Sequence, residues 1–128
     1  PAPIAFVSMD LDLYSSTKDA LKIFEADERF LLPRVLCYFD DILGYTYSEY
    51  NGERLAISEF NDIHSMRKIS LLYGLKYYVR SGDSWTDQIF FLHAFDHSLY
   101  NHPDSLHKAR RIDVNGRTEM EVVSAAGR

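Results

Sequence analysis

The stretch Ile4-Ala5-Phe6-Val7-Ser8-Met9-Asp10-Leu11-Asp12-Leu13-Tyr14-Ser15-Ser16-Thr17 decides the fold class of this chain. Residues 4–10 form an apolar run without alternation, which predicts a buried strand with helices on both of its faces. Two carboxylates, one residue apart, follow this run directly. Ser16 and Asp19 form a capping signal, and they predict a helix that runs to about Phe30.

The same arrangement occurs a second time at Val35-Leu36-Cys37-Tyr38-Phe39-Asp40-Asp41. Residues 34–39 predict a second buried strand, and we expect Pro33 to end the connection that precedes it. Strand, helix and strand at this spacing form a βαβ unit with parallel strands and a right-handed crossover. Both aspartate pairs are therefore expected at one edge of the sheet, where open α/β sheets bind ligands.

The rest of the chain predicts a helix from about residue 53 to 66 and strands over residues 71–80 and 87–96. The short gap between those strands favours an antiparallel hairpin. The predicted fold class is therefore α/β, with two parallel strands joined by a crossover helix, followed by a helix and an antiparallel hairpin. We expect residues 1–100 to form this domain and residues 101–128 to form a polar tail, with a small hairpin on its Asn-Gly turn.

Composition and charge narrow the function classes. The chain has 128 residues, 46% of them hydrophobic and 26% charged, which is typical of one globular domain. Its net charge of -5 argues against a nucleic-acid partner. Cys37 is the single cysteine, so we expect a reducing, cytoplasmic location and a buried structural thiol. No apolar stretch reaches the roughly 20 residues that span a bilayer, and no secretion signal is present in the sequence.

The two aspartate pairs predict a divalent metal site. A single Asp-x-Asp is best explained as a solvent-facing turn, but here two pairs each end an apolar strand of one βαβ unit. Carboxylates that lie close together repel unless a cation lies between them. Either Asp12 or Tyr14 is then placed to act as a general base for a substrate hydroxyl near the metal.

Other recognisable sites are weaker or absent in the sequence. His93 and His97 have helical spacing in a segment that predicts a strand, so they do not predict a zinc site. No serine-hydrolase elbow, dinucleotide-binding loop or P-loop occurs. The tyrosine-rich loop over residues 44–52 predicts either a lid over the site or an interface patch, and the sequence alone does not separate these. Its tyrosines are Tyr45, Tyr47 and Tyr50.

Three segments resemble the macrocin O-methyltransferase family, whose members are class I, S-adenosylmethionine-dependent enzymes that methylate sugar hydroxyls. The segments are Asp10-Leu11-Asp12-Leu13-Tyr14-Ser15-Ser16-Thr17-Lys18-Asp19-Ala20-Leu21, Phe39-Asp40-Asp41 and Gly52-Glu53-Arg54-Leu55-Ala56-Ile57-Ser58-Glu59-Phe60. The resemblance covers roughly residues 4–96 and implies the carboxyl-terminal half of a Rossmann-like methyltransferase domain. It implies that residues 4–10 and 34–39 are the fourth and fifth strands. The hairpin over 71–96 would hold the sixth strand and an antiparallel seventh.

The resemblance also implies the residues of a site. Asp10, Asp40 and Asp41 match the family's magnesium ligands, and Asp12 matches its proposed general base. The sequence departs from the family at Leu32-Pro33-Arg34, where a Pro-Gly-Gly-like turn is usual. It also lacks the half that carries the glycine-rich cofactor loop, so we expect this chain alone to bind S-adenosylmethionine weakly or not at all.

Two expectations follow from a half-domain. The apolar edge of strand 4–10 would pair with a second copy of the chain, giving a homo-oligomer, or be covered by the carboxyl-terminal segment. The sequence also leaves two rival functions open. One is a haloacid-dehalogenase-like phosphatase with Asp10 as nucleophile and Asp12 as acid/base, but the Ser/Thr and Lys that it needs have no convincing place. The other is a non-catalytic assembly domain.

Overall fold

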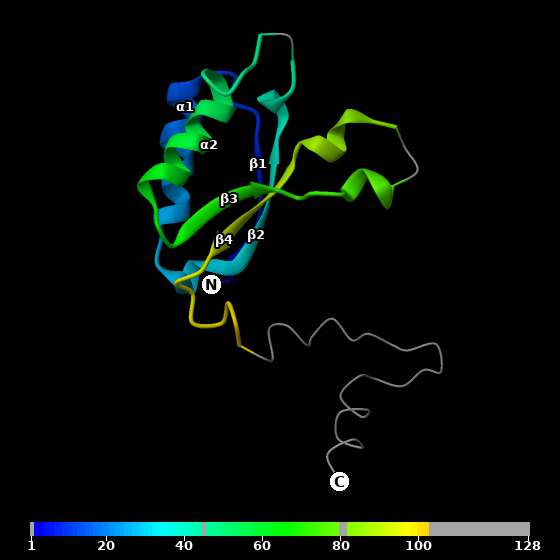
Figure 1. Cartoon of the computed structure of the whole chain (residues 1–128). Coiled ribbons are helices and arrows are strands. Elements are labelled where there is room, and N and C mark those ends of the chain that lie inside the picture. The colour runs from blue at the N-terminus through cyan, green and yellow to red at the C-terminus, as the bar shows by residue number, and fades with distance from the viewer. Residues whose placement is uncertain (1, 45, 80–81, 103–128) are drawn as a thin grey trace, which may run out of the picture.

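Four strands and two α-helices follow one another in the computed structural model, which describes residues 2–44, 46–79 and 82–102 (Figure 1). The strands are β1 (Ile4–Met9), β2 (Leu31–Phe39), β3 (Arg67–Leu71) and β4 (Ile89–Ala94). The α-helices are α1 (Tyr14–Ala20), between β1 and β2, and α2 (Gly52–Ile63), between β2 and β3.

The strands form one mixed sheet in the order β1-β2-β4-β3. β1 and β2 are parallel, while β4 runs antiparallel to both β2 and β3. The predicted α/β class, the parallel pair and the antiparallel arrangement of the last two strands are therefore confirmed, but β3 lies before most of the range predicted for it, and a long connection instead of a short turn joins it to β4. Because β1 and β2 are parallel, their carboxyl ends lie at the same edge of the sheet, at the top of Figure 1.

The core lies between one face of the sheet and the helices. Val35, Cys37 and Phe39 alternate along β2 and are fully buried, as the period of a strand requires. Phe24 and Phe60 reach this face from the helical side, with ring centroids 6.3 Å apart in an edge-to-face contact. Cys37 is confirmed as a buried thiol, and burial raises its pKa to about 12.

The prediction of helices on both faces is wrong for the described residues, because α1 and α2 lie on the same side of the sheet (Figure 1). On the other face Phe6 is 55% exposed, and Leu36 and Phe91 are half-buried. β1 is thus an exposed edge strand, not a buried one. An apolar run without alternation does not state how many of its faces are covered. Whether a second copy pairs with this edge stays a prediction.

Pro33 lies inside β2 and does not end the connection before it. The pairing of β1 with β2 shifts between Ile4, opposite Leu31, and Phe6, opposite Leu36. The extra residues on β2 form an irregularity around the proline, which has no N–H to donate to the ladder. The strand therefore begins earlier than predicted, and the irregularity absorbs the proline.

The first helix is also shorter than predicted. α1 begins after Leu13, which makes no side-chain cap, so the expected cap at Ser16 is wrong. The α-helical hydrogen-bonding pattern ends at Ala20, and 3₁₀ turns follow over Leu21–Glu25 and Glu28–Phe30. The carbonyl groups of Phe24 and Ala26 accept hydrogen bonds from Arg67 in β3 instead of from a continuing helix. A tertiary contact thus satisfies the end of this helical segment.

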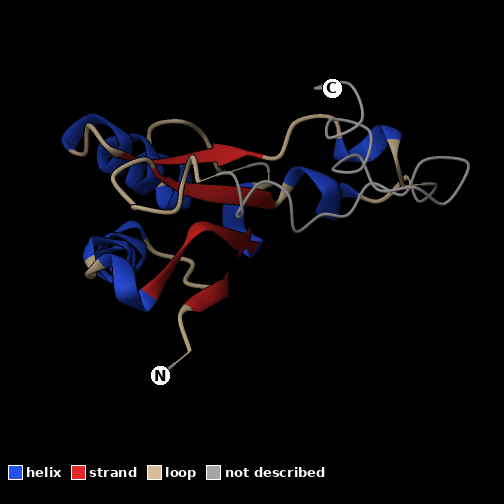
Figure 2. Ribbon diagram, turned by 90° about the horizontal axis from the view of Figure 1, so that it is seen from below, coloured by secondary structure: helices blue, strands red, loops and turns tan. Residues whose placement is uncertain are grey.

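The predicted strand over residues 71–80 is wrong, since β3 ends at Leu71 and a 3₁₀ turn occupies Leu75–Tyr77. Gly74 has a φ of 84°, a left-handed conformation that turns the chain. Tyrosines favour strands by propensity, but here three of them point into solvent, and packing decides strand formation. They are Tyr73, Tyr77 and Tyr78. Figures 1 and 2 show the segment between β3 and β4 extending away from the sheet.

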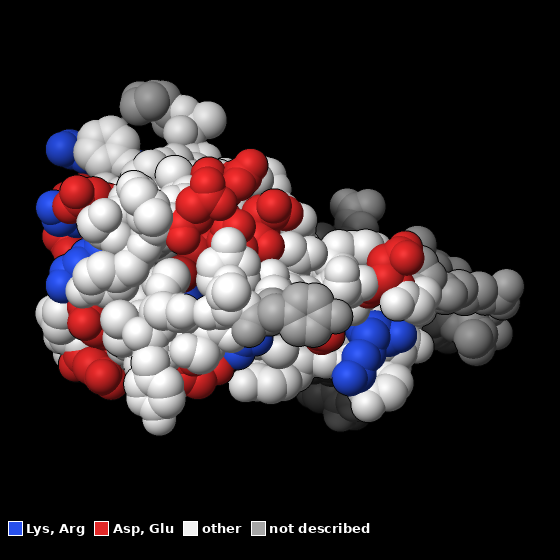
Figure 3. All heavy atoms as spheres, turned by 90° about the horizontal axis from the view of Figure 1, so that it is seen from above, with Lys and Arg blue, Asp and Glu red and all other residues white. Residues whose placement is uncertain are grey.

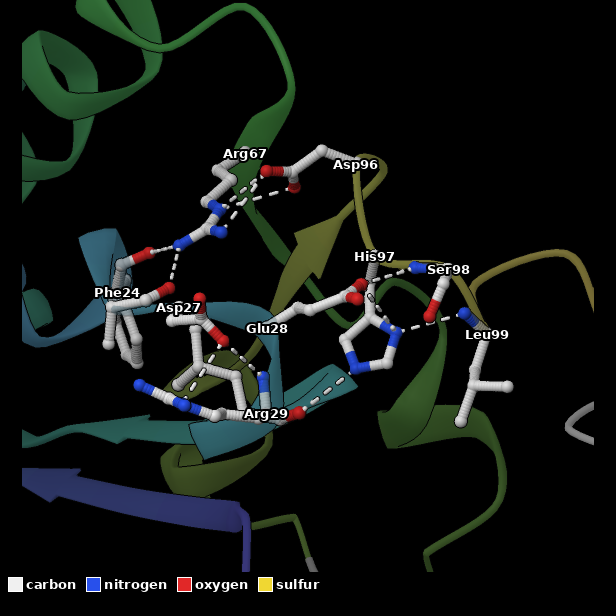
Figure 4. Close-up of polar contacts among 11 residues, drawn as sticks. Phe24, Asp27, Glu28, Arg29, Arg67, Asp96, His97, Ser98 and Leu99 are labelled. Carbon is white, nitrogen blue, oxygen red and sulfur yellow. Dashed lines mark hydrogen bonds and ion pairs between the residues drawn. The ribbon is translucent and has the colours of Figure 1, made fainter.

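The edge of the sheet opposite the aspartates contains a network of paired charges (Figure 4). Arg67 donates from Nη1 to the carbonyl oxygens of Phe24 and Ala26, each at 2.6 Å. Its Nη2 lies 3.1 Å from Oδ2 of Asp96, and this pairing holds the pKa of Asp96 below its usual value. His97 is hydrogen-bonded through Nε2 to the carbonyl of Leu31. The charges at this end therefore have partners.

Part of the predicted carboxyl-terminal tail lies outside the described residues, from residue 103 onward, and with it the hairpin on Asn115-Gly116. In the described part of the chain, every helix is too short or too polar to cross a lipid bilayer.

Candidate metal centre

Three of the predicted ligands meet at the carboxyl ends of β1 and β2. Met9 pairs with Phe39 in the parallel ladder, so the residues that follow, Asp10 and Asp40, leave the sheet side by side. One carboxylate oxygen from each of Asp10, Asp40 and Asp41 lies within 4.8 Å of the other two. Figure 3 shows acidic side chains gathered in one patch on the face above this edge.

A 3₁₀ turn brings the adjacent residues Asp40 and Asp41 to the same side. In an extended strand, neighbouring side chains point to opposite faces. Here β2 ends at Phe39, and Asp40–Ile42 form the turn, with Asp41 at φ -88° and ψ 19°. Because the strand ends before this pair, the side chains of Asp40 and Asp41 converge instead of pointing to opposite faces.

Hydrogen bonds orient the carboxylates. Asp41 accepts from the hydroxyl of Tyr47 at 3.0 Å through Oδ1, and from the backbone N–H of Asp12 at 2.9 Å through Oδ2. Asp40 accepts from the hydroxyl of Tyr38 at 2.6 Å. These donors fix the direction of each carboxylate and leave it further lone pairs for an ion.

Asp12 lies beside these three candidate ligands but does not belong to the group whose oxygens converge. Its backbone is in the left-handed region, with φ 43°, and the N–H of Leu13 bonds the carbonyl of Leu11 across it. The negative charge of Asp41 is the largest cause of a raised pKa at Asp12, and partial desolvation and Asp10 add to it. Asp12 is exposed to solvent beside these three aspartates.

Tyr14 faces a different part of the molecule. Its hydroxyl donates to Oε2 of Glu59 at 2.6 Å and accepts from Nζ of Lys18. These contacts join α1 to α2. The structure therefore places Asp12, and not Tyr14, beside the three converging aspartates.

The tyrosine loop contributes one residue to the centre. Tyr47 contacts Asp41, as described above, whereas Tyr50 is 87% exposed. Tyr45 lies outside the described residues.

Glu53 is the residue that sequence reasoning missed. It lies in the first turn of α2 and has no exposed surface. Its Oε2 accepts a hydrogen bond of 3.0 Å from the backbone N–H of Asp41, while its buried Oε1 has no partner. Burial, and then the charge of Asp41, raise the pKa of Glu53 to about 7. An acidic residue in the first turn of a helix is common because of the helix dipole, so no sequence pattern singles out Glu53.

Within the described ranges, no Lys or Arg pairs with the acidic group, which comprises Asp10, Asp12, Asp40, Asp41 and Glu53. Lys18, Lys22 and Lys68 bond Glu59, Asp19 and the carbonyl of Asn61 instead. Clustered carboxylate oxygens on an open surface are the ligands that Mg²⁺ and Ca²⁺ prefer, and the orphaned Oε1 adds a further acidic atom below them. The residues therefore fit a hard divalent cation.

A separate cleft of about 600 Å³ lies beside α2 and β3. Ile57, Ile69 and Phe90 contribute to its apolar lining, and Arg54 and Glu49 lie at its polar part. None of the five carboxylates of the centre lines it. The centre is thus an open surface site and not part of this cleft.

Comparison of the chain with protein-family models, with curated proteins and with solved structures gave no match. The functional interpretation therefore depends on the geometry of the centre and on the resemblance of the sequence segments.

Proposed function

We propose that this chain provides the Mg²⁺-binding part of an O-methyltransferase that acts on a sugar or another small hydroxylated molecule. The observation that carries the proposal is the convergence of Asp10, Asp40 and Asp41 from the ends of two parallel strands, without a cationic partner among the described residues. Two further features support it. The segments that carry these aspartates resemble the macrocin O-methyltransferase family, and the last described strand, β4, is antiparallel, as that resemblance implies.

Asp10, Asp40 and Asp41 would hold the ion. When bound, Mg²⁺ supplies a positive charge that orients two oxygens of the substrate and lowers the pKa of a coordinated hydroxyl. Tyr38 and Tyr47 keep two of these carboxylates in place through their hydroxyl groups. The site leaves one side open to solvent, where a substrate enters.

Asp12 would accept the proton of the substrate hydroxyl. Its carboxylate is exposed beside Asp41, and its raised pKa makes it a better base than an isolated aspartate. A base of this strength suffices for a hydroxyl that a metal has already acidified. The chain thereby orients the nucleophilic oxygen and removes its proton.

The residues of this chain do not fit the methyl donor. The sequence contains no glycine-rich loop after a strand, which is the element that holds such cofactors. We therefore derive no step through S-adenosylmethionine and expect this chain alone to bind it weakly or not at all.

The proposal is tested by calorimetry with Mn²⁺ and Mg²⁺, using Asp10→Asn as the ligand variant and Asp62→Asn, an exposed aspartate of α2, as the matched control. We expect saturable binding by the wild type and by Asp62→Asn. Asp10→Asn should lose at least tenfold in affinity, because the carboxylate charge disappears at nearly unchanged shape. Equal affinities in all three proteins would overturn the proposal.

Two further measurements separate the rival functions. Metal-dependent hydrolysis of an aryl phosphate would favour the phosphatase, although the lysines Lys18, Lys22 and Lys68 are bound elsewhere. Failure to bind either metal would favour the assembly domain. Transfer of a labelled methyl group to a sugar at high S-adenosylmethionine concentration, abolished by Asp12→Asn, would support methyl transfer directly.

A further inference from the structure

The turn that carries Asp40 and Asp41 is held by its backbone at three successive residues. The carbonyl of Asp40 accepts from Nε2 of Gln88 at 2.7 Å. The N–H of Asp41 donates to Glu53 at 3.0 Å, and the carbonyl of Ile42 accepts from Nε of Arg54 at 2.8 Å. The three side chains come from α2 and from the residue before β4, so two distant segments clamp one short turn.

Glu53 is the most unusual of the three. Gln88 and Arg54 are a neutral amide and a cation, and either is easily accommodated beside the four carboxylates of Asp10, Asp12, Asp40 and Asp41. Glu53 is a fifth carboxyl group with no exposed surface, placed below Asp41 and with one oxygen unpaired. Burial of a carboxyl group without full hydrogen bonding is unfavourable, so its presence needs a reason beyond packing.

Helix capping does not provide that reason. Glu53 lies in the first turn of α2, where a carboxylate commonly accepts from the free N–H groups of its own helix. Its recorded hydrogen bond runs instead to Asp41, 12 residues earlier, and the N-cap residue Asn51 makes no side-chain cap. The side chain thus points out of the helix and towards the ligand turn.

We propose that Glu53 is a positioning residue of the metal centre. By accepting a hydrogen bond from the N–H of Asp41, it orients the carboxylates of Asp40 and Asp41 towards one ion. This inference rests on the proposed metal site. The reach of the side chain matters for this role, because the acceptor oxygen has to meet an amide that is fixed at the end of β2. In other metal sites, residues that orient the ligands typically contribute 10- to 100-fold in metal affinity.

Two substitutions separate the effect of the length of the Glu53 side chain from the effect of its charge. Glu53→Gln keeps the length and an acceptor oxygen but removes the acid. Glu53→Asp keeps the acid but shortens the side chain by one methylene, so its oxygen no longer reaches the N–H of Asp41. Glu59→Gln is the matched control, because Glu59 lies on the same helix and bonds Tyr14 and Lys18 instead of the centre.

The measurement is the dissociation constant for Mn²⁺, by electron paramagnetic resonance of the free ion, with folding checked by circular dichroism. We expect Glu53→Asp to weaken binding about 10-fold or more, and Glu53→Gln and Glu59→Gln to stay within about threefold of the wild type. Equal affinity in wild type and Glu53→Asp overturns the positioning role. So does a loss in Glu53→Gln as large as that in Glu53→Asp, since charge would then be what matters.

The same titration distinguishes the two levels of the argument. A wild-type chain that binds no Mn²⁺ overturns the proposed function, and the positioning role with it. A wild type that binds, with variants that differ from it only in thermal stability, overturns the positioning role alone.

Discussion

At the amino-terminal end of β2, Arg67 bonds Asp96 and two carbonyl groups, and His97 bonds the carbonyl of Leu31, so each charge or dipole meets its opposite. At the carboxyl end of the same strand, five carboxyl groups gather and the described residues provide no cation for them. Both ends are polar, but only at the first end do the charged groups have partners of opposite charge among the described residues. The first end therefore contributes to the stability of the fold, whereas the second carries the cation site that we propose.

The largest loss of folding stability is expected from a substitution at the amino-terminal end of β2, where the charges are paired. Arg67→Ala should lower the free energy of unfolding by about 3 kcal/mol, because it leaves the carbonyl groups of Phe24 and Ala26 and the carboxylate of Asp96 without their donor. Urea unfolding measures this change. Arg29→Ala is the control, since the Arg29–Asp27 pair is mostly exposed and should matter by less than about 0.5 kcal/mol. Similar losses in both variants would contradict the distinction.

Addition of a divalent cation should stabilise the folded chain through the acidic end. At a free Mg²⁺ or Mn²⁺ concentration 100 times the dissociation constant, the wild type should gain about 2.7 kcal/mol of stability, because the ion binds only the folded chain. Chelation should reverse the gain. The double variant Asp10→Asn/Asp40→Asn should show no gain in the same thermal unfolding experiment. A gain that survives both substitutions would place the ion elsewhere.

The buried acid should give the metal-free chain an unusual pH dependence. The pKa of Glu53 is raised to about 7 in the folded chain, from a usual value of 4.5. Between these two values the folded chain retains a proton that the unfolded chain has lost, so stability falls as pH rises from about 4.5 to 7.

Chemical unfolding in chelator from pH 5 to 8 measures this dependence. The wild type should lose on the order of 2 kcal/mol relative to Glu53→Gln, which has no proton to release at this position. If the stability of the two proteins changed with pH in the same way, the pKa of Glu53 would not be raised in the folded chain.

The smallest effect concerns repulsion within the acidic end. In metal-free protein, Asp10→Asn should raise the melting temperature by roughly 2 °C, since it removes one of several like charges from an exposed cluster. Scanning calorimetry in chelator measures the rise. In 1 M NaCl the rise should disappear, because salt screens exposed charges over about 3 Å. A fall in melting temperature would mean that Asp10 supports the fold.

The sequence predicts the acidic end better than the rest of the fold. Apolar runs that end in Asp10 and Asp40 are local patterns, and the rule for βαβ units then places them at one edge. The contact of Glu53 with Asp41 joins two elements in space, and the pattern around Glu53 is that of any helix start. Its role therefore depends on geometry that a single sequence does not contain.

The failures elsewhere have the same physical origin. Tyr77 and Tyr78 have strand propensity, but no partner strand reaches them, and the segment extends into solvent. Pro33 predicts a break, but the shifted pairing between β1 and β2 accommodates it within a strand. The end of the 3₁₀ turn after α1 involves Arg67, which follows more than 40 residues later and donates to the carbonyl groups of Phe24 and Ala26. In each case tertiary packing overrides a local signal.

The left-handed backbone of Asp12 has a consequence for how sequences of this kind vary. A residue with a side chain adopts this conformation at a cost of about 1 kcal/mol relative to glycine, although aspartate tolerates it better than most. If only the bend mattered, glycine would be the most comfortable occupant. Related chains that keep the chemistry should therefore retain an acidic residue here, and chains that have lost it should drift to glycine or asparagine. The residue type at this position would then indicate whether a related chain retains the chemistry proposed for the centre.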